Sequence, residues 1–239
     1  MKPRIQIATA LAPDGGKMAL IRHDRDFIIT VDRKDLMLSR AHESELQLAR
    51  LGCAPLTGRR APKVLIGGLG MGYTLRQALD LLPSTGNVVM AELLPDIVQW
   101  NRDLLGELAG HPLRDPRVEL RVGDVGESIR RAPGTFDAIL LDVDNGPHAV
   151  TDARNAMLYN RRGLRDCLSA LRPRGRLAIW SASIDDRFEQ RLHEVTPHVR
   201  RFRAPTHAGG RTQPHCIWVA ANDAESLPEV SGPQDEEHR

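Results

Sequence analysis

The pattern of apolar and polar residues changes near residue 60. Before that point, short apolar-containing runs at residues 5–10, 18–23 and 27–31 are typical of strands, and Pro13-Asp-Gly-Gly16 is a strong turn signal between the first two. Residues 42–51 then have the apolar spacing of a helix. We therefore expect residues 1–50 to form a β-hairpin leader with a linking helix.

From residue 63 onward, strand-like runs alternate with helical patterns, which is typical of a mostly parallel sheet covered on both faces. The last two runs, 198–202 and 215–220, lie too close together for a crossover helix, so they predict an antiparallel hairpin. We expect one α/β domain at 51–220 and a disordered tail at 221–239, which holds six acidic residues and one arginine. The other predicted strands are 64–66, 88–91, 117–122, 136–141 and 176–180, and the predicted helices are 74–79, 95–108, 155–171 and 185–195.

The composition excludes several classes of protein. Of 239 residues, 41% are hydrophobic, which is enough to fill a core, and no apolar run approaches the roughly 20 residues of a membrane span. The first residues lack the apolar segment of a signal peptide, and the three cysteines form no CxxC pair. We expect a cytoplasmic protein with no membrane partner. Arginine clusters at 59–60 and 200–203 have few aromatic neighbours, which favours a solvated surface over a nucleic-acid site.

A glycine-rich turn within residues 63–73 carries the most specific signal in the chain. A short apolar run breaks into Gly68-x-Gly70-x-Gly72, and a helical pattern follows. Glycine permits positive φ in such a turn and lets a ligand lie against bare backbone. The next apolar run ends on Glu92, twenty residues after Gly72, where a carboxylate is placed to accept both hydroxyls of a ribose. Together these residues predict a nucleoside-binding site.

Acidic residues also follow the third and fourth predicted strands. Asp124 comes after the third strand, where it can accept a hydrogen bond from an adenine amino group, and Asp142 and Asp144 come after the fourth. Because the carboxyl ends of parallel strands meet at one edge of a sheet, these acids and Glu92 should converge on one crevice.

Residues 142–147, Asp-Val-Asp-Asn-Gly-Pro, are the candidate reaction edge. Their composition is also that of an ordinary turn, and a turn that presents carboxylates satisfies both interpretations. Downstream, Tyr159 either lines the pocket or packs its own helix. The histidines have no metal-like spacing, so we expect no metal.

These motifs together resemble the spermidine synthase family. Residues 63–76 resemble, without gaps, its first motif, whose glycine loop reads GGGDGG. The resemblance covers roughly residues 17–220 and implies an α/β, class I methyltransferase-like Rossmann fold behind a β-rich leader that often joins two subunits into a homodimer. Family members bind decarboxylated S-adenosylmethionine and transfer its aminopropyl group to an amine, which leaves methylthioadenosine. The further matching segments are Ala91-Glu92-Leu-Leu-Pro95, Gly123-Asp124-Val125, 140–147, 158–160 and 171–175.

The resemblance also implies roles for particular residues. Asp142 would be the catalytic base, with Asp144 beside it. The donor would be held by Gly68, Gly70, Gly72, Glu92, Leu93, Asp124, Val125 and Asp142, with Glu92 at the ribose and Asp124-Val125 at the adenine. The amine acceptor would be held by His42, Glu43, Asp144, Asn145 and Tyr159.

Three departures from the family pattern concern the reacting groups. The loop acid of GGGDGG, which disfavours a donor carboxylate, is Met71 in this chain. The second acid of the family's D-x-x-D-P element falls on Asn145. The Tyr-His-Glu or Tyr-Gln-Glu element becomes Ala41-His42-Glu43, without the tyrosine. The nucleoside site therefore looks intact, whereas the amine site looks altered.

Several functions are compatible with these residues. The first is an aminopropyltransferase acting on an amine. The second is an S-adenosylmethionine-dependent methyltransferase or related alkyl transferase with S-adenosylhomocysteine as a product, because Met71 removes a repulsion against the carboxylate of the full donor. A non-catalytic nucleoside-binding protein is a third hypothesis, and two acids after the fourth strand argue against it. A nicotinamide dehydrogenase fits poorly, because the terminal hairpin and those acids have no place in it.

Overall fold

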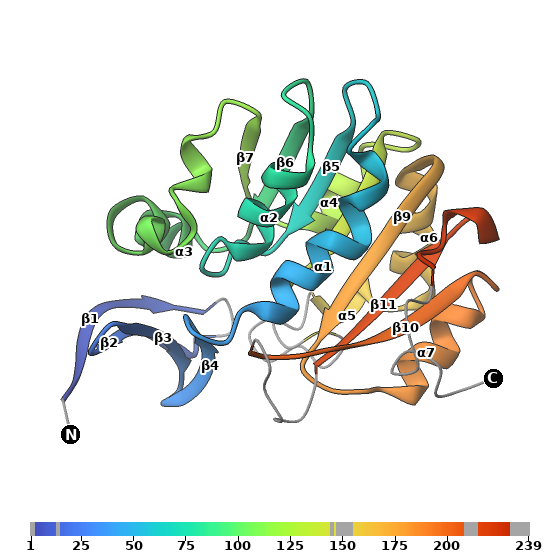
Figure 1. The fold of residues 1–239 in the computed structure, drawn as a ribbon. Helices are drawn as coiled ribbons and strands as arrows, with labels where there is room; N and C mark the ends of the chain where they lie inside the picture. Colours follow the sequence, from blue (N-terminus) through green and yellow to red (C-terminus); the bar gives the residue numbers. More distant parts are fainter. Residues whose placement is uncertain (1–2, 13–14, 144–145, 147–154, 208–214, 230–239) are drawn as a thin grey trace.

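The computed structural model describes residues 3–12, 15–143, 146, 155–207 and 215–229. An antiparallel sheet of four strands comes first, in the order β1 (Arg4–Leu11), β2 (Lys17–His23), β3 (Asp26–Val31) and β4 (Lys34–Leu38). Alternation in β2 turns Met18 and Leu20 inward, where both are buried. Figure 1 shows this sheet as a separate layer beside the main body of the protein.

The fourth strand of this leader is absent from the sequence prediction. Asp32 and Arg33 both have positive φ, 46° and 67°, which makes the short β3–β4 link a turn of the kind that favours hairpins. Neither residue is glycine, and β4 itself begins with two charged residues and has no β-branched one. Local propensity was therefore too weak to reveal the strand.

The main sheet has seven strands in the order β10-β11-β9-β8-β5-β6-β7. The central pairs β9–β8, β8–β5, β5–β6 and β6–β7 are parallel, whereas β11 is antiparallel to both β9 and β10. This arrangement confirms the predicted mostly parallel sheet and its antiparallel C-terminal hairpin. The strands are β5 (Lys63–Gly67), β6 (Asn87–Glu92), β7 (Val118–Val122), β8 (Phe136–Leu141), β9 (Leu171–Ser181), β10 (Val199–Ala204) and β11 (His215–Ala221).

Helices cover both faces of this sheet and create two apolar cores (Figure 1). On one face, α1 (Glu43–Cys53), α2 (Tyr73–Leu81) and α3 (Pro95–Trp100) pack together with the N-terminal sheet. The other face is covered by α4 (Val125–Arg130), α6 (Arg161–Ala170) and α7 (Asp186–His193), and the short α5 (Asn155–Leu158) precedes α6. None of the helices described is long and apolar enough to cross a membrane.

Two predicted helices are interrupted in the structure. The one predicted at 95–108 leaves α geometry after Trp100, continues as a π turn at Asn101–Leu105 and ends as a 3-10 turn at Gly106–Ala109. The one predicted at 155–171 breaks at Asn160, whose side chain accepts hydrogen bonds from the amides of Arg162 and Gly163, both at 2.9 Å. Asparagine in this position is a strong helix start, so α6 begins afresh there.

The last described segment packs against the sheet. β11 ends at Ala221, and a 3-10 turn follows at Ala224–Ser226, capped by Asp223. The buried Ser226 accepts a hydrogen bond from the Arg176 side chain through its carbonyl. The structure therefore places the first part of the predicted 221–239 tail, through Glu229, on the body of the protein, and residues 230–239 lie outside the described part.

Candidate functional site

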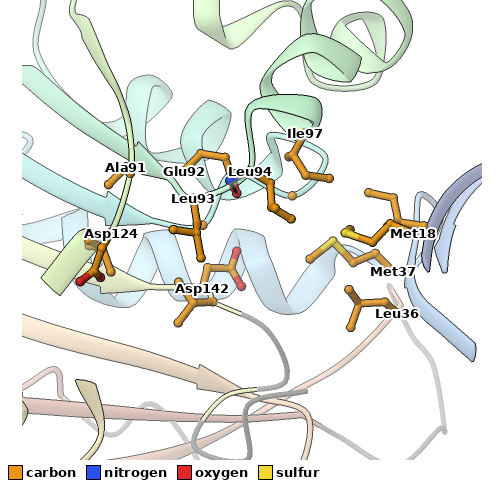
Figure 2. A pocket seen from close by; sticks show the side chains of 16 residues that line it. Met18, Leu36, Met37, Ala91, Glu92, Leu93, Leu94, Ile97, Asp124 and Asp142 are labelled. Atoms are coloured by element: carbon orange, nitrogen blue, oxygen red, sulfur yellow. Dashed lines mark hydrogen bonds between the residues drawn. The ribbon is translucent and has the colours of Figure 1, made fainter. Parts of the chain in front are cut away.

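The carboxyl ends of β5, β6, β7 and β8 meet at one cavity, which we call the first cavity (Figure 2). Glu92 ends β6, Asp124 follows β7 and Asp142 follows β8, and all three line this cavity, as the sequence predicts. The other residues that line this part of the cavity are Gly68, Gly70, Ala91, Leu93, Leu94, Ile97, Gly123, Val125 and Val143.

The glycine loop lies close against the end of β8. Gly68 has φ +88°, a conformation that side-chain-bearing residues rarely adopt, and a Cβ there would overlap the carbonyl group of Asp142. Gly70 also has positive φ, and a Cβ on it would lie 3.1 Å from the sulfur of Met37. Gly72, with φ +88°, begins α2 as its N-cap. Glycine at 68 therefore lets the loop and the Asp142 turn pack backbone to backbone.

Glu92 is held by the backbone of two loops. It is 7% exposed, and its two carboxylate oxygens accept hydrogen bonds from the amides of Leu69 at 2.8 Å and Leu94 at 2.9 Å. These two bonds orient the carboxylate at the wall of the first cavity, which Glu92 lines. Glu92 thus holds the glycine loop and the loop after β6 together at the place where the sequence predicts a ribose.

Asp124 and Val125 form the far end of the cavity. The Asp124 side chain accepts a hydrogen bond from the amide of Gly126 at 2.8 Å and so caps α4. Val125 is buried and packs against Gly67, where a Cβ would come within 2.8 Å of the valine side chain. Asp124 keeps its other oxygen 3.7 Å from the Arg130 guanidinium, and its side chain remains about one-third exposed, at 32%.

The opposite wall of the first cavity comes from the N-terminal sheet. Met18, Ile29, Leu36 and Met37 line it from β2, β3 and β4, and Figure 2 shows Met18, Leu36 and Met37 reaching toward it from that sheet. Sequence reasoning did not identify these residues, because only the packing of the leader on the main sheet brings them there. The leader therefore forms part of the candidate site.

A second cavity opens on the other side of Asp142, and its lining includes Glu45 and Met71. Leu36, Met37, Gly70 and Asp142 line both cavities. Aromatic and imidazole rings contribute much of the second wall, from Tyr73, Trp180, His207 and His215. The second cavity thus joins carboxyl groups and flat rings, a combination that suits an organic cation.

Asp142 is tightly placed between the two cavities. Its amide donates to the carbonyl of Gly67 at 2.8 Å, and its carboxylate accepts a hydrogen bond from the Thr74 hydroxyl at 2.6 Å. Burial, followed by the negative charge of Glu45, raises the pKa of Asp142 to about 7, and the Thr74 hydrogen bond opposes this rise. A carboxyl with a pKa near neutrality is suited to act as a general base.

The acid that α1 turns toward Asp142 is Glu45, which the sequence analysis did not single out. Burial raises the pKa of Glu45, and the hydrogen bond from the adjacent Ser44 hydroxyl, 2.7 Å long, lowers it. The predicted residue, Glu43, forms an ion pair with Arg50 at 2.8 Å instead. Because Leu48, Ala49, Gly52 and Cys53 are the buried face of α1, helical spacing places residue 45 on that face, and this signal was available in the sequence.

The remaining predicted acceptor residues have different positions. His42 stacks on Tyr73 with ring centroids 4.1 Å apart, and both residues hydrogen-bond to the carbonyl of Ser39. Tyr159 is 1% exposed and packs edge-on against Phe188 in the core beneath α6 and α7, so it packs rather than lines either cavity. Asp144 and Asn145 lie outside the described residues, and their roles stay predictions.

Comparison with known proteins identifies the family. The model of the spermine/spermidine synthase domain matches residues 50–187, which is more than half of the chain. The chain belongs to the spermine/spermidine synthase family. The match contains the glycine loop, Glu92, Asp124 and Asp142, so the wall of the first cavity that the main sheet forms lies within the family domain, whereas the wall from the N-terminal sheet lies outside it.

Curated relatives of this spermine/spermidine synthase family member are polyamine aminopropyltransferases. The chain is 32% identical over 152 residues to polyamine aminopropyltransferase 2 of Pseudomonas aeruginosa, a match covering 59% of this chain and 41% of that protein. It is 34% identical over 148 residues to the enzyme of Nitrosomonas europaea, covering 59% and 43%. The matches thus span less than half the length of these relatives.

Solved structures show the same fold. Spermidine synthase from Thermotoga maritima superimposes with a TM-score of 0.69 at 18% identity, covering 93% of this chain and 76% of that one. A spermidine synthase in complex with the transition-state analogue AdoDATO gives a TM-score of 0.70 at 18% identity, covering 93% and 75%. These likenesses support the spermidine synthase fold, including its N-terminal sheet.

The raised pKa of Asp142 predicts a pH-dependent gain in stability when the charge is removed. Since its pKa is about 7 when folded and 3.8 ordinarily, the folded protein loses stability from this group as pH rises from about 4 to 7. The stability of Asp142→Asn relative to the wild type should therefore rise between pH 5 and pH 8 by at least about 1 kcal/mol, or about 2–4 °C in Tm. Thermal melts at both pH values test this, and an equal difference at the two would contradict it.

Proposed function

We propose that this protein is an aminopropyltransferase that uses decarboxylated S-adenosylmethionine as donor and a small amine as acceptor. The observation that carries the proposal is that Asp142 lines both cavities. The first cavity has the acids and glycines that suit a nucleoside, and the second has carboxyl groups and rings that suit a cation. The names of the curated relatives, polyamine aminopropyltransferases, support the same reaction.

The transfer needs an amine that has lost a proton. An alkylamine has a pKa near 10, so it enters mostly as a cation and one nitrogen must be deprotonated before it can attack. The amine nitrogen then forms a bond to the carbon next to the sulfonium, the carbon–sulfur bond breaks, and methylthioadenosine leaves with the electron pair. The proton released from the amine passes to the Asp142 carboxylate. Alignment of amine, carbon and sulfur across the two cavities supplies much of the rate.

Donor binding follows from the first cavity. Glu92 accepts the ribose hydroxyls, and the bare backbone at Gly68 and Gly70 lets the donor approach closely. Asp124 accepts from the adenine amino group, while Val125 and Leu93 supply apolar contact. Asp124 also caps α4, so the same side chain that contacts the adenine holds the first turn of this helix.

Acceptor binding involves Glu45 and Asp142, with Trp180 and Tyr73 as flat walls. These groups attract a cation by charge and by the negative faces of the rings. Asp144 and Asn145, predicted from the sequence, complete this proposed site. A homodimer in the cytoplasm also remains part of the proposal.

The experiment is a mass-shift screen with purified protein. Putrescine, cadaverine, spermidine and simple aromatic amines are each incubated with decarboxylated or full S-adenosylmethionine. A gain of about 57 Da in the acceptor together with methylthioadenosine signifies aminopropyl transfer, whereas a gain of about 14 Da signifies methyl transfer. Methyl transfer, or no transfer to any amine by protein that binds the donor, would overturn the proposal.

Met71 predicts an unusual tolerance for the carboxylated donor. It occupies the loop position where the family has an acid, it is buried, and it lines the second cavity. Without that acid, S-adenosylmethionine should bind at least as tightly as its decarboxylated form. Met71→Asp should shift preference toward the decarboxylated form, with Met71→Asn as the uncharged control. Calorimetry measures the affinity for both donors. If the wild type prefers the decarboxylated donor by tenfold or more, about 1.4 kcal/mol, the prediction is wrong.

A further inference from the structure

A chain of hydrogen bonds joins two residues that line the second cavity, Glu45 and His215, through the buried Ser44. The Ser44 hydroxyl donates to the Glu45 carboxylate at 2.7 Å and lies 2.9 Å from Nδ1 of His215. Ser44 is fully buried, and His215, on β11, packs edge-on against Trp180 with centroids 4.7 Å apart. Residues that are far apart in sequence thus meet behind one carboxylate.

The direction of each bond follows from the available hydrogens. A hydroxyl has a single hydrogen, which Ser44 gives to Glu45, so Ser44 must accept from Nδ1–H of His215. Burial, together with His207 nearby, lowers the pKa of His215 to about 4, so the ring is neutral at physiological pH. His215 therefore carries its proton on Nδ1 and donates to Ser44, and the two successive bonds reinforce each other.

We propose that Ser44 and His215 are positioning residues that hold the Glu45 carboxylate in its ionised form at the wall of the second cavity. This proposal rests on the proposed function, and it assigns two effects to the Glu45 charge. Its charge attracts the cationic acceptor, and the same charge makes Asp142 more basic. Neither Ser44 nor His215 needs to touch the reacting atoms for this effect.

Other titratable groups face Glu45 as well. Asp35, Tyr73, Asp142, His207 and His215 line the same cavity, and Glu43 lies on the same helix. Glu43 is ion-paired with Arg50, and the pKa of Tyr73 is raised to about 12, so Tyr73 stays neutral near pH 7. Glu45 is the carboxylate to which Ser44 donates, and the charge of Glu45 in turn raises the pKa of Asp142.

The sign of the expected effect is fixed by this arrangement. Ser44→Ala removes the bond that favours ionised Glu45, so Glu45 holds its proton to higher pH. Asp142 then loses a repulsive neighbour and ionises at lower pH. A hydrogen bond to a charged group is worth about one to two pKa units at Glu45, and part of that change reaches Asp142, so the acidic limb of kcat/KM should move down by roughly half a unit to one unit. At neutral pH the acceptor KM should rise several-fold.

The experiment compares Ser44→Ala, His215→Ala and His215→Asn with a matched control, Thr196→Val. Asparagine can place an amide donor where Nδ1 stood, so it should recover part of the shift. Thr196 donates a buried hydroxyl to the carbonyl of Ala221 at 2.8 Å, away from both cavities. Its loss should leave the pH profile unchanged. If Ser44→Ala lowers activity without moving the acidic limb, or moves it upward, the proposal is wrong.

A second measurement needs no turnover. Because Glu45 binds its proton more tightly without Ser44, the Tm difference between wild type and Ser44→Ala should widen from pH 5 to pH 8. For Thr196→Val it should stay constant. A constant difference for both variants would overturn the role of Ser44 even if aminopropyl transfer is confirmed. If the Tm difference between wild type and Ser44→Ala widens but the protein transfers no aminopropyl group, the positioning role of Ser44 is supported and only the proposed function is rejected.

Discussion

Asp142→Asn is expected to lower kcat by roughly 10²–10⁴, the range for loss of a general base, while methylthioadenosine affinity stays within about twofold. The substitution keeps the shape of the side chain and can still accept from Thr74, whose hydroxyl lies 2.6 Å away. It cannot take the proton from the amine. The backbone of residue 142 is fixed by its bond to Gly67, so the turn should keep its position. Steady-state kinetics with the acceptor found by the mass-shift screen measures the loss.

Thr74→Val is the matched control for this result. It removes the hydrogen bond that lowers the pKa of Asp142 but leaves the carboxylate in place. The acidic limb of kcat/KM should therefore move upward, and activity should recover at high pH. Asp142→Asn should not recover at any pH. Full turnover in Asp142→Asn would place the active site elsewhere. If the acidic limb of kcat/KM does not move in Thr74→Val, the limb does not report the ionisation of Asp142.

The sequence was most informative where burial dictates residue type on its own. Strand β8 has every residue from Phe136 to Leu141 buried, and only Asp137 interrupts its apolar run, so the pattern predicts a buried strand, which the structure has at those bounds. The glycine loop could be predicted from the sequence because the fold leaves no space for a side chain at residue 68. Because parallel strands have their carboxyl ends at one edge of the sheet, the strand pattern also predicts that Glu92, Asp124 and Asp142 lie together.

Short elements and tertiary contacts were harder to predict. Helix α4 has only six residues and contains Gly126, so its periodicity is weak, although Asp124 with Glu127 three positions later is a recognisable helix-start pair. Met18 and Met37 became part of the first cavity only because the leader packs over it. The family motif points to Glu43, whereas the buried face of α1 favours Glu45.

Glu92→Ala is expected to weaken methylthioadenosine binding by about 1.5–3 kcal/mol, or roughly 10- to 150-fold, the scale of hydrogen bonds to a buried charge. Part of this loss has a second origin, because Glu92 also accepts from the amides of Leu69 and Leu94. Removing the carboxylate leaves both amides without that acceptor and loosens the glycine loop. A simple loss of affinity therefore cannot by itself show that Glu92 binds the ribose.

A ligand lacking the ribose hydroxyls separates the two effects. In the wild type, changing methylthioadenosine to its 2′,3′-dideoxy analogue should cost most of the same 1.5–3 kcal/mol, about the value of the two lost hydrogen bonds. In Glu92→Ala the same change should cost little, because the acceptor is already gone, and the coupling between residue and ligand group isolates their interaction. Glu92→Gln keeps one carbonyl oxygen, so its cost for losing the ribose hydroxyls should lie between the costs in wild type and Glu92→Ala. Calorimetry on the four combinations gives the coupling, and equal costs in wild type and Glu92→Ala would assign Glu92 to loop positioning alone.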